Sequence, residues 1–159
     1  MAEKISKLMR INYLGMDTSF APGLKRKDYV MRKFDILKKK TGANYLSIAG
    51  LITDIAKRVD VKRVCYCGLM LPVFEDILLA RKVDENEMNI ERILLLLSVC
   101  RCRLDTIPVS GNISKKCIYA ILFDTATLSK KLQKPLSVHL LPIKNKKDAT
   151  GQGFIHNIL

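Results

Sequence analysis

The fold is decided by the stretch VKRVCYC-GLMLP-VFEDILLARK, which spans residues 61–82. Its first part is rich in valine and predicts a strand over residues 61–67. The segment 68–72 begins with glycine and ends with proline, which predicts a loop. The amphipathic run after it predicts a helix from Val73 to about Lys82. A strand, a loop and a helix in this order are the repeating unit of a parallel α/β fold.

The same alternation continues on both sides of this stretch. Two further strands are predicted, over residues 10–15 and 136–141. Apolar positions at three- and four-residue spacing predict further helices over residues 28–41, 46–59, 90–100 and 114–132. Asp28 is expected to cap the first of these helices, and residues 101–112 are expected to form a loop because they contain Pro108 and Gly111. The buried stripe of the helix 46–59 is expected to consist of Leu51, Ile52, Ile55, Ala56 and Val59.

Three strands are a small sheet for this much helix. We therefore predict a single α/β domain over residues 1–159 with an incomplete parallel sheet. Self-association or another chain is expected to cover its remaining apolar surface, so that the chain does not work as an isolated monomer.

The composition narrows the class of protein. The chain has 28 Lys and Arg against 15 Asp and Glu, a net charge of +13, which attracts anions. The basic residues are spread along the whole chain and no nucleic-acid motif accompanies them, so nucleic acid is an improbable main partner and a small anionic molecule is preferred. No signal peptide or apolar run of membrane-spanning length is recognisable. Five cysteines without such a signal indicate reduced thiols and a cytoplasmic protein with no membrane partner.

Three motifs carry a family resemblance: GMDTSFAP at residues 15–22, CGLMLPVFED at 67–76 and LDTIP at 104–108. In this order they resemble the domain of unknown function family 711. The resemblance implies a pyruvate formate-lyase-like α/β barrel, of which this chain would supply the C-terminal part and thus a partial barrel. No glycyl-radical motif is recognisable, so the resemblance implies a shared fold and not radical chemistry.

Three stretches depart from the family pattern, one of them Lys144-Asn145-Lys146 in place of a Pro-Gly-Lys turn. Arg101, Cys102 and Arg103 stand where family members carry a glycine-bearing stretch, and Ser110-Gly111-Asn112 replaces Pro-Gly-Asp. Arginine cannot adopt the glycine conformations that bring a backbone close to a ligand. A site inherited from the family could therefore be altered or inactive.

The candidate site residues lie in the three motifs and in the altered loop. Carboxylates that could act as acids, bases or hard-metal ligands are Asp17, Glu75, Asp76 and Asp105. Candidate ligand-binding residues are Thr18, Ser19, Gly68, Thr106, Arg101 and Arg103. Asp17, the 68–72 turn and Asp105 are expected to converge around one concave site. The alternative is that Asp17 and Asp105 brace loops while Glu75 and Asp76 stabilise the first turn of a helix.

The cysteines suggest a second hypothesis, a zinc site. Cys65 and Cys67 on a strand would share a face, and with Cys100 and Cys102 they could form a four-thiolate zinc site. The two-residue spacing does not match zinc knuckles, so core packing is preferred and no metal site is predicted. The histidines are His139 and His156, which leaves a Cys/His pair open. No cofactor follows from these residues.

Three functions remain. The first is a small-molecule-binding or enzymatic domain with its site in the motif loops. The second is a non-catalytic interaction or regulatory subunit that completes a partner's barrel. The third is non-specific nucleic-acid binding through surface lysines.

Overall fold

The structure is a computed structural model that describes residues 1–100 and 103–144. These residues form six α-helices, one short 3-10 helix and a two-stranded parallel sheet. The helices are α1 (Ala2–Met9), α2 (Val30–Thr41), α3 (Tyr45–Arg58), α4 (Ile77–Asp84), α5 (Ile90–Cys100) and α6 (Lys115–Leu132), with the 3-10 helix η1 at Arg26–Asp28. The strands are β1 (Leu104–Ser110) and β2 (Val138–Ile143). The predicted mixture of helix and parallel strand is confirmed at this level.

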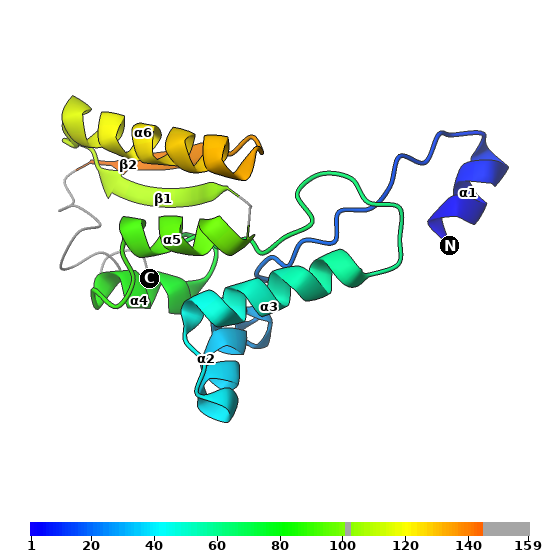
Figure 1. Ribbon diagram of the computed structural model, residues 1–159, viewed down its shortest axis with the longest axis horizontal. Helices are drawn as coiled ribbons and strands as arrows, with labels where there is room; N and C mark the ends of the chain where they lie inside the picture. Colours follow the sequence, from blue (N-terminus) through cyan, green and yellow to red (C-terminus); the bar gives the residue numbers. More distant parts are fainter. Residues whose placement is uncertain (101–102, 145–159) are drawn as a thin grey trace.

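The β1–α6–β2 unit is the regular part of the fold. β1 pairs in parallel with β2, with Ile107 opposite Leu140 and Ser110 opposite Ile143. Parallel strands need a long crossover, which α6 supplies as it runs along the strand pair (Figure 1). Ser114 caps α6 by accepting a hydrogen bond from the Cys117 N–H at 3.1 Å. Gly111 lies where β1 turns back, and a Cβ there would meet the Ile143 carbonyl oxygen at 3.0 Å.

Two of the three predicted strands are wrong. Residues 10–15 form no strand, and residues 61–67 contribute only an isolated parallel bridge between Arg63 and Met16; a second such bridge joins Leu69 to Phe20. Cys65 and Cys67 have φ angles of 63° and 49°, and left-handed residues interrupt an extended ladder. The two cysteines also do not share an environment, because Cys65 is exposed and Cys67 is buried.

The predicted loop at residues 101–112 is also wrong over most of its length, because β1 occupies Leu104–Ser110. The third predicted strand, over residues 136–141, is present but displaced toward the C-terminus as β2. Pro108 did not prevent strand formation. It pairs with Leu141 within the parallel ladder.

The helix start at α2 differs from the prediction. Asp28 lies in η1 and gives α2 no side-chain cap. Instead the carboxylate of Asp76, far along the chain, accepts the Met31 N–H at 2.8 Å. At the other end α2 stops as predicted at Gly42, whose φ of 72° suits glycine.

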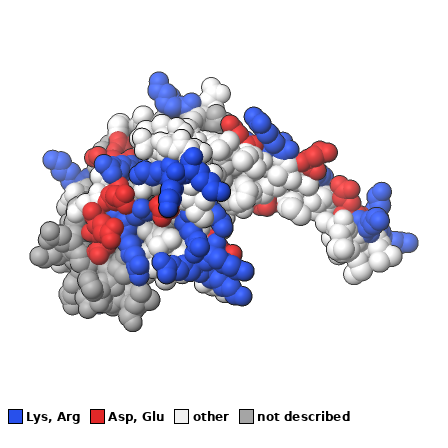
Figure 2. Space-filling model, turned by 90° about the horizontal axis from the view of Figure 1, so that it is seen from below, with Lys and Arg blue, Asp and Glu red and all other residues white. Residues whose placement is uncertain are grey.

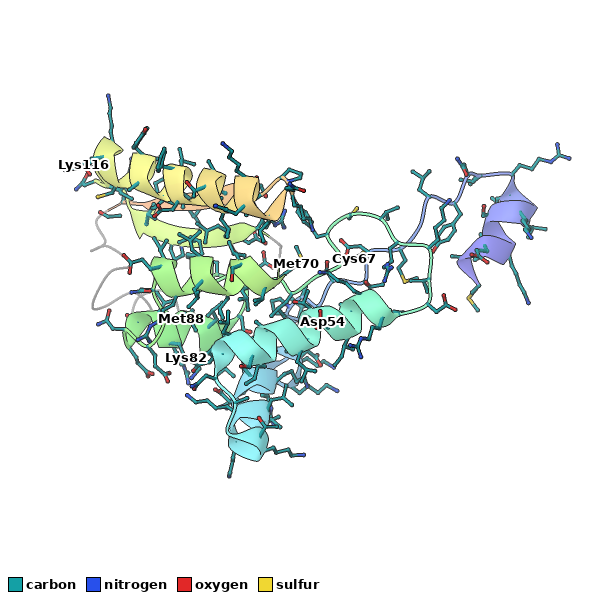
Figure 3. The ribbon with its side chains drawn as sticks, in the orientation of Figure 1. Asp54, Cys67, Met70, Lys82, Met88 and Lys116 are labelled. Carbon is teal, nitrogen blue, oxygen red and sulfur yellow. The ribbon has the colours of Figure 1, made fainter. Side chains whose placement is uncertain are left out.

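The core lies between α2, α3, α4, α5 and β1. Its largest fully buried side chains are Phe34, Met31, Ile48, Leu69, Leu71, Leu79, Met88, Ile93, Leu96, Leu97, Leu104 and Ile107. Lys82 at the edge of the core contacts Asp35 at 3.3 Å and Glu87 at 2.8 Å, which links α4 to α2 (Figure 3).

The buried stripe of α3 matches the prediction at Ala56, and Ile52 is half-buried against the core, but the other three residues of the predicted stripe are exposed. α3 buries Ile48, Ala49, Thr53 and Ala56. Leu51, Ile55 and Val59, expected to be buried, are between 43% and 51% exposed. One face of α3, with Ile48 and Ala56, therefore packs on the core, and Leu51, Ile55 and the following Val59 are left uncovered.

The first 20 residues form an N-terminal arm that carries α1 far from the other helices, while its residues 16–20 lie beside residues 63–69 through the two isolated bridges (Figure 1). The arm begins with α1, none of whose residues is buried. Its exposed apolar side chains are Met1, Ile5, Leu8, Met9, Ile11, Leu14, Met16 and Phe20. None of the described helices is both long and apolar enough to cross a membrane.

Candidate functional site

Asp17 and Ser19 hold the first two motif loops together. The Asp17 Oδ1 accepts hydrogen bonds from the Ser19 N–H at 2.9 Å, the Ser19 hydroxyl at 2.6 Å and the Cys67 N–H at 3.1 Å. The Ser19 Oγ in turn accepts the Gly68 N–H at 3.2 Å. Thr18 donates its hydroxyl to the Ala56 carbonyl at 2.8 Å. These contacts match the loop-bracing role that the sequence leaves open for Asp17.

The same contacts shift the acidity of Asp17. Partial burial raises the pKa of the carboxyl, but the hydrogen bonds from Ser19 and from the backbone of Cys67 lower it by more. The pKa of Asp17 therefore lies below its ordinary value, which favours a carboxylate that accepts hydrogen bonds over one that donates a proton.

Asp76 and Glu75 have different surroundings. Asp76 is 1% exposed, and its Oδ1 accepts the N–H groups of Leu78 and Leu79 at 3.0 and 3.2 Å. Its Oδ2 accepts the Met31 N–H, so one carboxylate satisfies the first turns of α4 and α2. Glu75 is exposed next to it. The contacts of Asp76 are those of a helix cap.

Asp105 is the second residue of β1 and is 2% exposed. Its Oδ2 lies 2.9 Å from the Arg103 Nε, and its Oδ1 lies 3.6 Å from the His139 Nδ1. Arg103 Nε is within ion-pair distance but is not oriented for a hydrogen bond. Since Leu104 pairs with Val138, the register itself brings His139 beside Asp105. The prediction of a loop over residues 101–112 excluded β1, so it could not place His139 beside Asp105.

Thr106 follows with an unusual backbone. Its φ is 45°, a genuine outlier for a β-branched residue, and the β1–β2 register shifts between Leu104 and Ile107. Its hydroxyl oxygen is shielded from solvent and has no hydrogen-bond partner among the described residues. Strain of this kind is found preferentially at functional sites. We call Arg103, Asp105, Thr106 and His139 the β1-start cluster.

A single segment, residues 67–73, contacts both groups. Its Cys67 N–H binds Asp17, and its Val73 N–H donates to the Asp105 carbonyl at 3.3 Å. Cys67 and Met70 mark this segment in Figure 3. The predicted site was expected in loops beyond the carboxyl ends of strands. Asp105 lies instead at the amino end of β1. Convergence of Asp17 and Asp105 on one concave site stays a prediction.

The chemistry of the β1-start cluster is that of a carboxylate between two groups that can be cationic. Arg103 is 38% exposed and His139 57%, so both side chains reach solvent beyond Asp105. Within residues 1–100 and 103–144, no three His, Cys, Asp or Glu side chains are arranged to hold a metal ion. Arg101, Cys102 and His156, named in the sequence analysis, lie outside the described residues.

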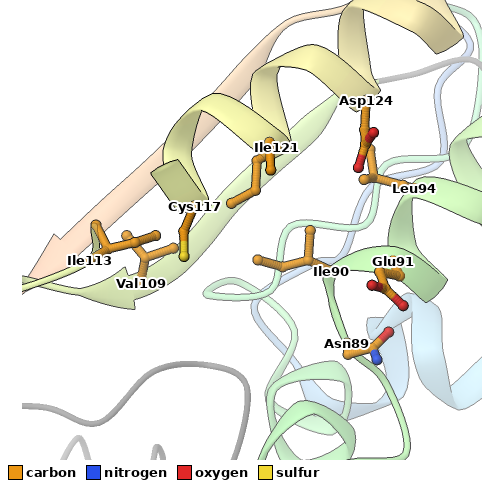
Figure 4. A pocket seen from close by; sticks show the side chains of 10 residues that line it. Asn89, Ile90, Glu91, Leu94, Val109, Ile113, Cys117, Ile121 and Asp124 are labelled. Atoms are coloured by element: carbon orange, nitrogen blue, oxygen red, sulfur yellow. The ribbon is translucent and has the colours of Figure 1, made fainter. Parts of the chain in front are cut away.

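A cavity of about 270 Å³ lies elsewhere, between the first turns of α5 and α6 and near Val109 at the carboxyl end of β1 (Figure 4). Its apolar lining includes Ile90, Leu94 and Ile121, and its charged lining consists of Glu91 and Asp124. None of the predicted site residues lines it. The sequence analysis missed this cavity because it depends on how two helices pack.

Fold and cluster together define a mixed α/β protein with a parallel β1–α6–β2 unit and a polar, charged cluster at the start of its inner strand. The chain belongs to the family described as Uncharacterised ACR (DUF711), whose profile matches residues 1–152. The resemblance drawn from the three motifs is thereby confirmed.

The curated relatives are UPF0210 proteins. The chain is 26% identical over 153 residues to one from Pyrobaculum aerophilum and 26% identical over 153 residues to one from Methanococcoides burtonii. It is 27% identical over 152 residues to one from Clostridium perfringens. Each alignment covers 92% of this chain and 34% of the relative, so the chain spans about a third of their length. No solved structure gives a significant match.

Proposed function

We propose that this chain binds a small anion, a carboxylate or a phosphate, at the β1-start cluster. The observation that carries the proposal is the buried Asp105 carboxylate, which contacts Arg103 on one side and faces His139 on the other. Asp105 orients both side chains, while the guanidinium keeps N–H groups that a planar anion can engage in pairs. Thr106, next to Asp105 in β1, has a buried hydroxyl without a partner among the described residues.

The surrounding charge supports the same ligand class. A net charge of +13 raises the local concentration of anions around the whole chain. If the domain is catalytic, His139 is the group we assign as general base, because Asp105 faces its Nδ1 and leaves Nε2 for the substrate. The separation of 3.6 Å would then have to shorten when substrate binds.

Titration calorimetry with inorganic phosphate and with malonate tests the binding proposal. Arg103→Gln should weaken binding by about tenfold or more, since charge-assisted hydrogen bonds contribute about 1.5–3 kcal/mol. Arg32→Gln, on the exposed face of α2, is the matched control and should leave the affinity unchanged. Equal affinities of the wild-type and Arg103→Gln proteins, or no binding of either anion, contradict the proposal.

Asp105→Asn separates a binding role from a bracing role. It should weaken anion binding with little loss of stability, because the amide keeps the shape of the carboxylate and loses its charge. A large fall in the free energy of unfolding with unchanged binding would instead make Asp105 a loop brace.

A second candidate function is a non-catalytic interaction subunit, which joins a second copy or a complementary chain. One observation favours it: large apolar side chains are uncovered on the N-terminal arm and on the Leu51–Ile55–Val59 row of α3. Large apolar side chains exposed in this number are typical of a surface that a partner covers. Sedimentation at micromolar concentration tests it, and a compact monomer that binds no apolar dye would contradict it.

A further inference from the structure

The face of the sheet that carries the β1-start cluster continues past His139 toward the start of β2. Leu104 pairs with Val138 and donates its N–H to the Ser137 carbonyl at 3.0 Å, so Ser137 lies directly before the first pair of the ladder. Side chains two residues apart on a strand point to the same face and are about 7 Å apart. Ser137 and His139 therefore share one face, and His139 is the one that lies beside Asp105.

Two further polar side chains gather at Ser137. The Tyr66 hydroxyl lies 3.4 Å from the Ser137 Oγ, and Ser137 is exposed, so this pair of hydroxyls reaches solvent. The Lys134 Nζ donates to the Tyr66 carbonyl at 3.3 Å and lies 5.5 Å from the centre of the tyrosine ring. Lys134 forms no ion pair within the part of the chain that the structure describes, so no carboxylate there neutralises its charge. We call Tyr66, Lys134 and Ser137 the β2-start group.

The β2-start group retains hydrogen-bond donors. Two hydroxyls that share one hydrogen bond leave the second O–H to donate elsewhere, and an ammonium with one acceptor keeps two of its three donors. At the other end of the same face, the Arg103 side chain reaches Asp105, which brings its guanidinium to the His139 end. The face therefore has a cationic group with hydrogen-bond donors at each of its two ends.

We propose that the ligand of the β1-start cluster is an elongated dianion, such as a dicarboxylate, whose second anionic group binds at the β2-start group. The first anionic group contacts Arg103 and His139. The second accepts hydrogen bonds from the hydroxyl pair of Tyr66 and Ser137, beside the positive charge of Lys134. This inference rests on the proposed anion site and names the class of ligand that the site takes.

Titration calorimetry with glutarate and pentanoate tests the second contact, because pentanoate has a methyl group in place of one carboxylate. The wild-type chain should bind glutarate about tenfold more tightly, the effect of about one charge-assisted hydrogen bond. Tyr66→Phe combined with Ser137→Ala should lower this ratio by about threefold or more, and Lys134→Gln should lower it as well. Inorganic phosphate is too short to span both ends, so its affinity should stay the same in these variants.

Two variants serve as matched controls. Lys131→Gln removes the same charge from an exposed position three residues before Lys134, at the end of α6. Tyr119→Phe removes the hydroxyl of an exposed tyrosine elsewhere on α6. Both variants should keep the wild-type preference for glutarate. Thermal unfolding checks that every variant is folded, as expected for substitutions that keep the size of the side chain or remove one exposed hydroxyl.

The results separate the second contact from the anion site itself. Equal wild-type affinities for glutarate and pentanoate, both weakened by Arg103→Gln, overturn the dianion and keep the anion site. A preference for glutarate that survives both Lys134→Gln and the Tyr66→Phe, Ser137→Ala double variant overturns the role of the β2-start group. If neither acid nor inorganic phosphate binds, the anion site and the dianion are both overturned.

Discussion

The carboxylates singled out in the sequence differ at the scale of single residues. Asp76 faces three backbone N–H groups, whereas Asp105 faces two side chains that can carry positive charge. Helix N–H groups are satisfied equally well by many capping residues, so Asp76 requires no ligand to explain its burial. A buried carboxylate beside Arg103 and His139 holds groups that can also recognise something outside the chain.

Asp76→Ala should destabilise the fold by about 2–3 kcal/mol, because it removes the cap of α4 and leaves the Met31 N–H buried without its acceptor. Chemical denaturation measures the change. Glu75→Ala, at the exposed neighbouring position, should stay within about 0.5 kcal/mol of the wild-type protein. Similar effects of the two variants would remove the capping role.

Asp17 gives a prediction for pH. Its pKa in the folded chain lies below the unfolded value of about 3.9, so the carboxylate stabilises the fold above that pH. The contribution disappears as the pH falls through the folded pKa. Urea unfolding between about pH 2 and pH 6 should therefore show a steeper acid loss for the wild-type chain than for Asp17→Asn. Parallel curves for the two proteins would show that the ionisation of Asp17 does not contribute to the acid loss of stability.

At the scale of elements, the sequence predicted helices better than strands. The helices from α2 to α6 begin and end within a few residues of the predicted bounds, because capping signals and apolar spacing are local. A strand, in contrast, forms only where a second strand is placed to hydrogen-bond with it. Residues 10–15 and 61–67 have strand-like composition, yet they form no ladder, while β1 forms around Pro108 because β2 lies beside it.

The candidate site was predictable only in part, for the same reason. The third motif contains Asp105 and Thr106, and both belong to the β1-start cluster. The position of His139 depends on strand register and the cavity between α5 and α6 depends on helix packing, and the residue pattern reveals neither. The predicted α3 stripe is buried at Ala56, but Leu51, Ile55 and Val59 are exposed, because the face of the helix that meets the core depends on packing.

Thr106 belongs both to β1 and to the β1-start cluster. Its left-handed backbone should be relieved by glycine, so Thr106→Gly is expected to raise the free energy of unfolding by up to about 1 kcal/mol. The same change alters the backbone that positions the neighbouring Asp105 and should weaken anion binding. Thermal unfolding and phosphate titration on one sample measure both effects. Lower stability with unaltered binding would show that the strain has no functional counterpart.

At the scale of the whole molecule, the positive charge is distributed and not concentrated on one element. Figure 2 shows Lys and Arg side chains across the middle of one face and again on the N-terminal arm, with acidic side chains among them. Such a surface contacts phosphates without reading bases.

Nucleic-acid binding should therefore be weak and independent of sequence. Fluorescence anisotropy with two duplexes of unrelated sequence should give similar dissociation constants that rise steeply with salt. Preference for one duplex that persists at physiological salt would contradict this and would favour the third function considered for the chain.

The binding of a small anion at the β1-start cluster is tested most directly at His139. The chain has two histidines, so His156→Gln leaves His139 as the sole imidazole signal in an NMR spectrum. Added phosphate or malonate should shift that signal in a saturable way, because the anion binds next to the ring. In the Arg103→Gln background the shift should disappear. A His139 signal that does not respond to either anion, or that responds equally without Arg103, would contradict the assignment of this cluster as an anion site.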